Sequence, residues 1–300
     1  MKKNKIKSSL INFGLKYISV DDKIVRMFLQ TKPSNLKEIV ILPATKIVEK
    51  RLIKKLEQQK SYGRVTNGVL NGVIVSVIRS LVGCPNTSVT LESLKRCSVK
   101  AIVRVDFCGG VSLDDIPISI GDILVPNMTY CGDGTCPQYI MKYPELHDQL
   151  NSIPNPNPKI QELKSGNQSV YITEPNKQLK DILINEGTTI IPRRIKEVDF
   201  WTTDALFCEN ELFINSLKSI SVQGIDMENS IFFLFSKLFN IKVASILSVS
   251  DLPGHPKYDL FNSNTLHPDM ETGIENAIKI TIASLPKIKS LLITQKNQVP

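Results

Sequence analysis

Residues 224–251 read GIDMENSIFFLFSKLFNIKVASILSVSD, and this stretch decides the fold class. Apolar residues from Ile225 to Phe239 are spaced as in a helix with a broad apolar face, and Ile241 to Val249 is an apolar run typical of a buried strand. A helix that leads into a buried strand indicates an α/β domain. Glu228 and Asp251 then lie near the helix start and at the carboxyl end of the strand, where open α/β sheets bind ligands.

The elements before this stretch fit the same class. Ile39 to Leu42 is a short apolar run, and Lys46 to Gln59 has apolar residues at helical spacing. Asn71-Gly72 separates two apolar runs, 64–70 and 73–79, and predicts a hairpin turn. Further strands are predicted at Ala101–Val105, Ile120–Val125, Thr188–Ile191 and Glu197–Thr202. Further helices are predicted from Pro85-Asn86-Thr87 through Cys97, and from about Met270 to Leu285. The pattern predicts a single domain with a central mixed β-sheet flanked by helices.

The domain is expected to span residues 39–290. Residues 1–38 are predicted to be an N-terminal extension, partly flexible, and residues 291–300 a C-terminal tail. Around 151–169 the chain turns polar, with three prolines alternating with asparagine and no periodicity. Apolar segments resume afterwards, so this stretch is interpreted as a polar insertion within the domain.

Composition limits the classes of function. A hydrophobic content of 42% is ordinary for a globular protein with a core. The net charge is +8, but the basic residues are mostly dispersed lysines, which indicates a solvated surface and no nucleic-acid partner. No apolar stretch approaches the roughly 20 residues of a transmembrane helix, so no membrane association is expected.

Six cysteines lack the close spacing of metal ligands, so free thiols in a cytoplasmic protein and no metal site are expected. Three histidines supply neither a His-rich metal site nor a Ser-His-Asp triad well. The chemistry must therefore come from carboxylates, arginine and backbone groups.

Several segments occur in the order found in a known family. They are GCPNTS at 83–88, Arg104, IGDILVP at 120–126, TTDALF at 202–207, GIDMENS at 224–230 and SVSD at 248–251. Together they resemble the nucleoside phosphorylase family, which includes uridine phosphorylases and hexameric purine nucleoside phosphorylases. The resemblance covers roughly residues 39–286, so it implies one nucleoside phosphorylase-like domain.

The resemblance implies roles in binding ribose and base. Met227 and Glu228 would contact the ribose, and Glu228 and Asp251 would be catalytic, because charge develops on the sugar while the base leaves. The base-binding residues that it implies are Phe207, Thr203, Ser250 and Asp251. The residue types alone leave other interpretations open. Glu228 would also complement a helix dipole. Asp251 and Ser250 would also be typical of a turn. Met227, Phe207 and Trp201 would also be typical of a hydrophobic core.

Arg104 lies inside an apolar strand, where it needs an anionic partner. The resemblance implies phosphate, with Lys46, Arg64 and Arg79 as further phosphate-binding candidates. An internal salt bridge to Asp106 or Asp122 is the alternative. The chain also departs from the family here. Pro43-Ala44-Thr45-Lys46-Ile47 replaces the usual Gly-Asp-Pro phosphate loop, and Asp106 would repel phosphate.

The resemblance therefore predicts a pentosyltransferase of purine salvage: a purine nucleoside phosphorylase that uses phosphate as co-substrate, needs no cofactor and yields ribose 1-phosphate and free base. The uracil-reading Gln and Arg of uridine phosphorylases are not found at 208–212, which favours a purine. Uridine phosphorylase, a phosphate-independent nucleosidase and a non-catalytic nucleoside-binding homologue are the alternatives. A homo-oligomer, a dimer or hexamer, is expected from the resemblance.

Overall fold

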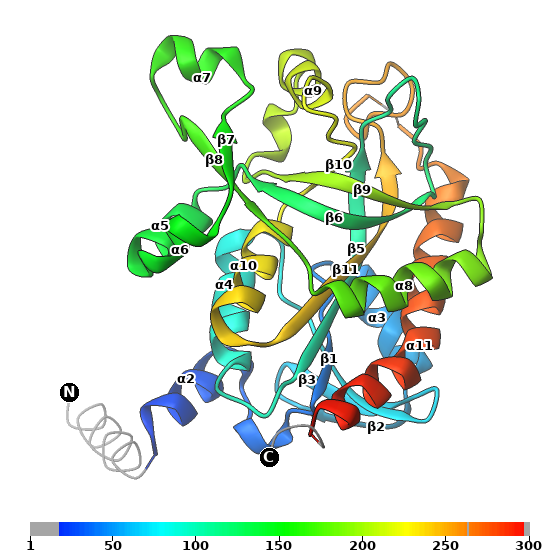
Figure 1. The fold of residues 1–300 in the computed structure, drawn as a ribbon. Helices are drawn as coiled ribbons and strands as arrows, with labels where there is room; N and C mark the ends of the chain where they lie inside the picture. Colours follow the sequence, from blue (N-terminus) through cyan, green and yellow to red (C-terminus); the bar gives the residue numbers. More distant parts are fainter. Residues whose placement is uncertain (1–17, 263, 297–300) are drawn as a thin grey trace, which may run out of the picture.

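A computed structural model describes residues 18–262 and 264–296 of the chain. One mixed sheet runs through the molecule, with the strand order β2-β3-β4-β1-β5-β10-β9-β6-β8-β7 and β11 paired with both β5 and β6 (Figure 1). The strands are β1 (Ile39–Ile41), β2 (Glu57–Tyr62), β3 (Val65–Leu70), β4 (Val73–Ile78), β5 (Ala101–Gly110), β6 (Ile123–Cys131), β7 (Ser152–Pro154), β8 (Ser169–Thr173), β9 (Ile195–Thr202), β10 (Gly224–Asp226) and β11 (Lys242–Asp251). The predicted central mixed sheet is confirmed.

Helices cover both faces of this sheet. They are α2 (Val20–Leu29), α3 (Lys46–Lys55), α4 (Cys84–Leu94), α5 (Thr135–Lys142), α6 (Glu145–Gln149), α7 (Pro158–Leu163), α8 (Lys177–Ile190), α9 (Glu211–Lys218), α10 (Asn229–Phe239) and α11 (Pro268–Lys296), with short 3-10 turns η1 (Pro33–Asn35) and η2 (Leu206–Cys208). Successive β5 side chains alternate between the two layers: Val103 packs with α3, α8 and α11, whereas Ile102 packs with α2, α4 and α10. Burial on both faces explains the continuous apolar runs of β5 and β11.

The hairpin between β3 and β4 forms as predicted. Leu70 pairs with Val73, and both turn residues have positive φ, 47° at Asn71 and 72° at Gly72. Asparagine and glycine tolerate this left-handed conformation better than other residues, and the resulting turn matches the twist of the two strands.

Several predicted boundaries were wrong. Thr188–Ile191 is not a strand, because α8 continues to Ile190 and the hydroxyls of Thr188 and Thr189 donate to carbonyls one helical turn earlier. A short apolar run does not distinguish the two states by itself. The predicted helices at 46–59 and 225–239 each overlap a strand, β2 and β10 respectively, and the last helix extends to Lys296. The polar stretch 151–169 contains β7 and α7.

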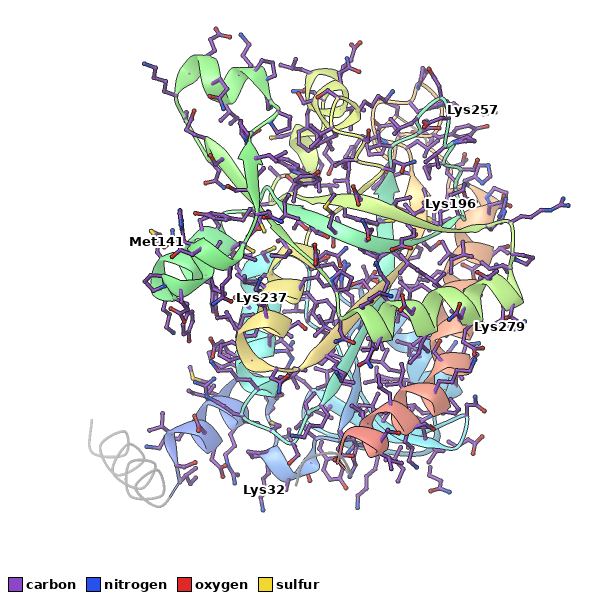
Figure 2. The ribbon with its side chains drawn as sticks, in the orientation of Figure 1. Lys32, Met141, Lys196, Lys237, Lys257 and Lys279 are labelled. Carbon is purple, nitrogen blue, oxygen red and sulfur yellow. The ribbon has the colours of Figure 1, made fainter. Side chains whose placement is uncertain are left out.

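The lysines are spread over the surface, as their dispersed sequence positions predict. Lys32, Lys237, Lys257 and Lys279 are exposed and lie at well-separated points of the molecule (Figure 2). Within residues 18–262 and 264–296, no helix combines the length and apolar character needed to cross a membrane.

The carboxyl ends of three strands define one edge of the sheet. β5 runs parallel to both β1 and β11, so all three end on the same side. Near this edge the register between β5 and β11 shifts between Val249 and Asp251. Such a bulge changes the direction of side chains at the strand end, which places Ser250 and Asp251 beside the β5 backbone.

Candidate functional site

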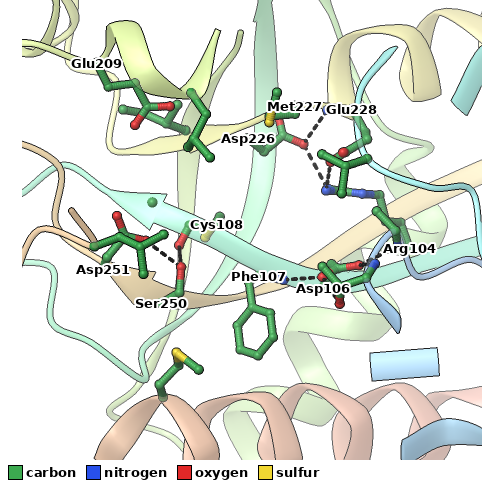
Figure 3. Close-up of a pocket in the computed structure, with 18 of the residues that line it drawn as sticks. Arg104, Asp106, Phe107, Cys108, Glu209, Asp226, Met227, Glu228, Ser250 and Asp251 are labelled. Atoms are coloured by element: carbon green, nitrogen blue, oxygen red, sulfur yellow. Dashed lines mark hydrogen bonds and ion pairs between the residues drawn. The ribbon is translucent and has the colours of Figure 1, made fainter. Parts of the chain in front are cut away.

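A cavity of about 310 Å³ opens at this edge of the sheet (Figure 3). Its walls come from the loop after β1, the second half of β5, β10 with Met227 and Glu228, and the end of β11. Val82, Leu206, Glu209, Leu260, Leu266 and Met270 complete the lining. The structure therefore brings together Arg104, Met227, Glu228, Ser250 and Asp251, all of which the sequence had singled out.

Glu228 is positioned by the start of α10 and by the segment that precedes α4. Asp226 caps α10, because its Oδ2 accepts hydrogen bonds from the backbone N–H groups of Asn229 at 2.8 Å and Glu228 at 3.2 Å. Glu228 itself makes no capping bond. Its Oε1 accepts from the backbone N–H of Gly83 at 2.8 Å, and its Oε2 pairs with Arg104. The carboxyl group is thus held at the cavity wall and does not serve as a helix cap.

Burial raises the pKa of Glu228 to about 7, because the loss of water outweighs the opposing charge of Arg104. Next to it, Met227 lines the cavity and its carbonyl lies 3.2 Å from the Cys84 sulfur. A flexible apolar side chain beside a buried carboxyl group suits a sugar, which presents both carbon faces and hydroxyls.

Arg104 is buried and makes an internal ion-pair network. Its Nη1 donates to Asp226 at 2.8 Å and to Asn229 Oδ1 at 3.0 Å, and its Nη2 donates to Glu228. Burial would lower the pKa of this guanidinium, but the charges of Glu228 and Asp226 outweigh it and raise the pKa. The alternative of an internal salt bridge is confirmed, with other partners than the predicted Asp106 or Asp122.

Asp106 follows Arg104 by two positions on β5 but has a separate set of hydrogen-bond partners. Its Oδ2 accepts from the backbone N–H of Ala44 and from that of Thr45 at 2.9 Å. Its Oδ1 accepts from the Thr45 hydroxyl and from the N–H of Phe107, each at 2.9 Å. The carboxylate of Asp106 therefore fixes the loop between β1 and α3 to β5, together with the backbone N–H of Leu42, which donates to the carbonyl of Val103 at 2.9 Å.

The other predicted phosphate-binding residues do not join Arg104. Lys46 is exposed at the start of α3. Arg64 donates to the carbonyls of Phe28 at 2.8 Å and Arg79 at 2.7 Å, and Arg79 pairs with Glu49 at 3.4 Å. None of the three lines the cavity. The structure thus does not bring Lys46, Arg64 and Arg79 together with Arg104 at the cavity.

Asp251 lies on the opposite side of the cavity from Glu228 (Figure 3). The Ser250 hydroxyl lies 2.6 Å from its Oδ1 and 3.1 Å from the carbonyl of Cys108. Burial raises the pKa of Asp251 above its ordinary value, although the hydrogen bond from Ser250 lowers it. A carboxylic acid with a raised pKa, oriented by a hydroxyl, can donate a proton to a leaving base.

Two of the predicted base-binding residues lie elsewhere. Phe207 is 84% exposed and its ring lies 4.7 Å from that of Phe261. Thr203 is buried, but its hydroxyl accepts from the N–H of Ala205 and it does not line the cavity. Trp201 packs in the core against Tyr130. These corrections follow from the direction of each side chain, which strand position alone does not give.

Phe107 and Glu209 also line the cavity, although no sequence pattern singled them out. Burial raises the pKa of Glu209 to about 8, and the charges of Asp251 and Asp259 add to the effect. Thr202 was also missed: its hydroxyl donates to Asp226 at 2.7 Å and so fixes the carboxylate that pairs with Arg104. Glu209 and Thr202 occurred in segments already compared with the family, but no pattern of spacing marked them.

Comparison with known proteins identifies the family of the chain. A model described as "Phosphorylase superfamily" matches residues 38–286. The chain is 22% identical over 271 residues to a DeoD-type purine nucleoside phosphorylase of Buchnera aphidicola subsp. Baizongia pistaciae, covering 87% of this chain and 98% of that one.

Two solved structures show the same fold. One is a purine nucleoside phosphorylase from Toxoplasma gondii in complex with immucillin-H, with a TM-score of 0.66, 18% identity, and coverage of 88% of this chain and 96% of that chain. The other is a uridine phosphorylase from Vibrio fischeri complexed with 6-hydroxy-1-naphthoic acid, with a TM-score of 0.64, 18% identity, and coverage of 85% and 93%. The resemblance deduced from the sequence is confirmed.

Proposed function

Since the chain belongs to the phosphorylase superfamily, we propose that it is an enzyme that cleaves the bond between the ribose and the base of a purine nucleoside. The observation that carries the proposal is the placement of Glu228 and Asp251 on opposite sides of one cavity. Each has a raised pKa and a separate set of partners, so the two carboxyl groups can serve the sugar and the base respectively.

The proposed mechanism begins at the sugar. Cleavage of a ribosyl bond passes through an oxocarbenium-like state, in which positive charge builds on the ring. Ionised Glu228 accepts hydrogen bonds from the ribose hydroxyls and stabilises this charge, and Met227 packs against the sugar and excludes water. Arg104 keeps the carboxyl group of Glu228 in place and favours its charged form.

The other half of the mechanism takes place at the base. The electron pair of the breaking bond moves into the purine ring, and protonated Asp251 donates a proton to the imidazole side of the purine. Ser250 orients the donor. We propose a purine because a pyrimidine has no imidazole ring to accept this proton. Uridine phosphorylase is the alternative within the family.

The expected location and assembly remain proposals from family membership. We propose a cytoplasmic homo-oligomer, either a dimer or a hexamer, that takes part in purine nucleoside metabolism without a cofactor. The sequence-based hypothesis also makes phosphate the ribosyl acceptor, with ribose 1-phosphate as product. The phosphate-dependent and phosphate-independent reactions share the chemistry above and differ in the second substrate.

The experiment that tests the proposal follows base release from inosine, adenosine, guanosine and uridine. We expect the purine nucleosides to be cleaved faster than uridine, because only they accept a proton from Asp251 at an imidazole ring. Equal or faster cleavage of uridine would make uridine phosphorylase the better assignment. Release of no base from any of the four would favour a non-catalytic nucleoside-binding homologue.

A further inference from the structure

Two backbone N–H groups before α3 converge at the wall of the cavity. They belong to Ala44 and Thr45, and Thr45 is the N-cap residue of a ten-residue helix. N–H groups that converge at a helix start form a site for an anion, because they are unpaired donors at the positive end of the helix dipole. In this chain the anion is supplied internally: the carboxylate of Asp106 accepts from both groups.

The Asp106 carboxylate occupies this anion site and accepts hydrogen bonds from both of its backbone N–H groups. Four donors surround its two oxygens: the N–H groups of Ala44, Thr45 and Phe107, and the Thr45 hydroxyl. Asp106 is 2% exposed and lies on β5, in the interior of the sheet. An incoming anion would have to displace a buried carboxylate that is held by these four donors and would then leave that charge without partners.

The rest of the cavity offers no other site at which phosphate could bind. Among the described residues that line it, Arg104 is the only lysine, arginine or histidine. Both of its Nη atoms are engaged by Asp226, Asn229 and Glu228, and only its Nε lacks a partner. The carboxyl groups in the lining belong to Asp106, Glu209, Asp226, Glu228 and Asp251. With Asp251 protonated for proton transfer and Glu209 protonated below about pH 8, Asp106, Asp226 and ionised Glu228 still outnumber the one cation. This excess of negative charge repels a phosphate dianion and does not repel a neutral molecule such as water.

From this arrangement we infer that Asp106 is a built-in substitute for an inorganic anion, and that the ribosyl acceptor at this site is water. The inference rests on the proposed function, since it names the second substrate of the same reaction. The product is then free ribose, and the enzyme acts as a nucleosidase and does not carry out phosphorolysis.

The step balances with the residues already placed. The oxygen of water forms a bond to C1′ of the ribose as the bond between C1′ and the purine nitrogen breaks. The electron pair of the broken bond goes to the base, which takes a proton from Asp251. The attacking water releases one proton to solvent, and Asp251 takes up one proton from solvent. Nucleoside and water give ribose and free base with no other reactant.

The first test uses the wild-type protein with a purine nucleoside, in phosphate-free buffer and at increasing inorganic phosphate. We expect the same rate of base release throughout, free ribose as the sugar product, and no rise of the melting temperature with phosphate. A rate that depends on phosphate, with ribose 1-phosphate as product, would overturn the inference.

The second test empties the anion site. In Asp106→Gly the N–H groups of Ala44 and Thr45 lose their carboxylate, so we expect inorganic phosphate to bind at least about tenfold more tightly than to the wild type by calorimetry. Asp106→Asn keeps the size and removes the charge, and a smaller gain is expected from it. If Asp106→Gly does not fold, the Asn variant decides. Unchanged phosphate binding in the variant that folds would contradict the filled site.

A matched control is Asp122→Asn. Asp122 is also buried, accepts a backbone N–H from Ser119 at 3.0 Å and pairs with Lys196, but it does not line the cavity. It should lose stability without any gain in phosphate binding. Failure of the proposed function has a different signature. If no nucleoside releases its base, the reaction with water is rejected together with the proposed function. The comparison of phosphate binding still confirms or rejects the filled anion site.

Discussion

The guanidinium of Arg104 lies 2.8 Å from the carboxylate of Asp226, and both side chains are withdrawn from solvent. This ion pair joins the middle of β5 to the end of β10, and Glu228 extends it to the cavity wall. A buried charge is costly without a partner, so the buried carboxylates of Asp226 and Glu228 both depend on the single cation of Arg104. Arg104 therefore holds the site together, and it affects the reaction through the position and charge of Glu228.

Arg104→Ala should destabilise the protein by about 3–5 kcal/mol, because it leaves the buried carboxylates of Asp226 and Glu228 without their cation. Denaturant unfolding measures this loss. Arg51→Ala is the control: Arg51 pairs with Glu271 and Glu275, which are more exposed, so a much smaller loss is expected. Equal losses in the two variants would show that the Arg104 network contributes no more than a surface pair.

Glu228→Gln should lower turnover roughly thirty- to a thousandfold, the effect of losing a charge-assisted bond worth about 2–4 kcal/mol in the transition state. Folding stability should change far less, because Asp226 still balances Arg104. Wild-type kcat/KM should rise as the pH rises through about 7, where Glu228 ionises, and the variant should lack this limb. Unchanged turnover with lower stability would reject the ribose role. Glu92→Gln, in an ion pair outside the cavity lining, serves as the control.

Ser250→Ala should move the alkaline limb of the pH–rate profile to higher pH. The Ser250 hydroxyl lowers the pKa of Asp251, so its removal raises that pKa further and keeps the acid protonated over a wider range. Asp251→Asn should abolish the limb together with most of the activity. A profile that does not move in Ser250→Ala would show that the Ser250–Asp251 contact has no part in proton transfer.

Glu209→Gln should stabilise the protein at alkaline pH and have little effect at pH 4. Burial raises the pKa of Glu209 to about 8 in the folded protein, so the folded state binds its proton more tightly than the unfolded state. Its contribution to stability is fully present below the ordinary pKa of glutamate and is lost as the pH rises through about 8. The variant has no proton to lose. Melting temperatures of both proteins across this range should therefore diverge as pH increases; parallel curves would contradict the shifted pKa.

The fold class, the family and the residues at the two ends of the cavity could be predicted from the amino-acid sequence. Apolar runs such as 101–105 and 241–249 indicate strands buried on both faces, because a strand covered on both sides carries apolar side chains at successive positions. Met227, Glu228, Ser250 and Asp251 were found because they lie in two short segments whose order and spacing resemble a known family. Local sequence carried this information, so no tertiary contact was needed to find it.

The interactions of the charged groups could not be predicted from the sequence, because they depend on the three-dimensional fold. Arg104 pairs with Asp226 and Glu228, which lie 122 and 124 positions away along the chain, and Asp106 fills a site made by residues 61 and 62 positions away. Such pairings depend on which strands are neighbours and on where each side chain points. The sequence shows a charged residue and its place in a strand. The fold determines which partner lies close enough to stabilise that charge when it is buried.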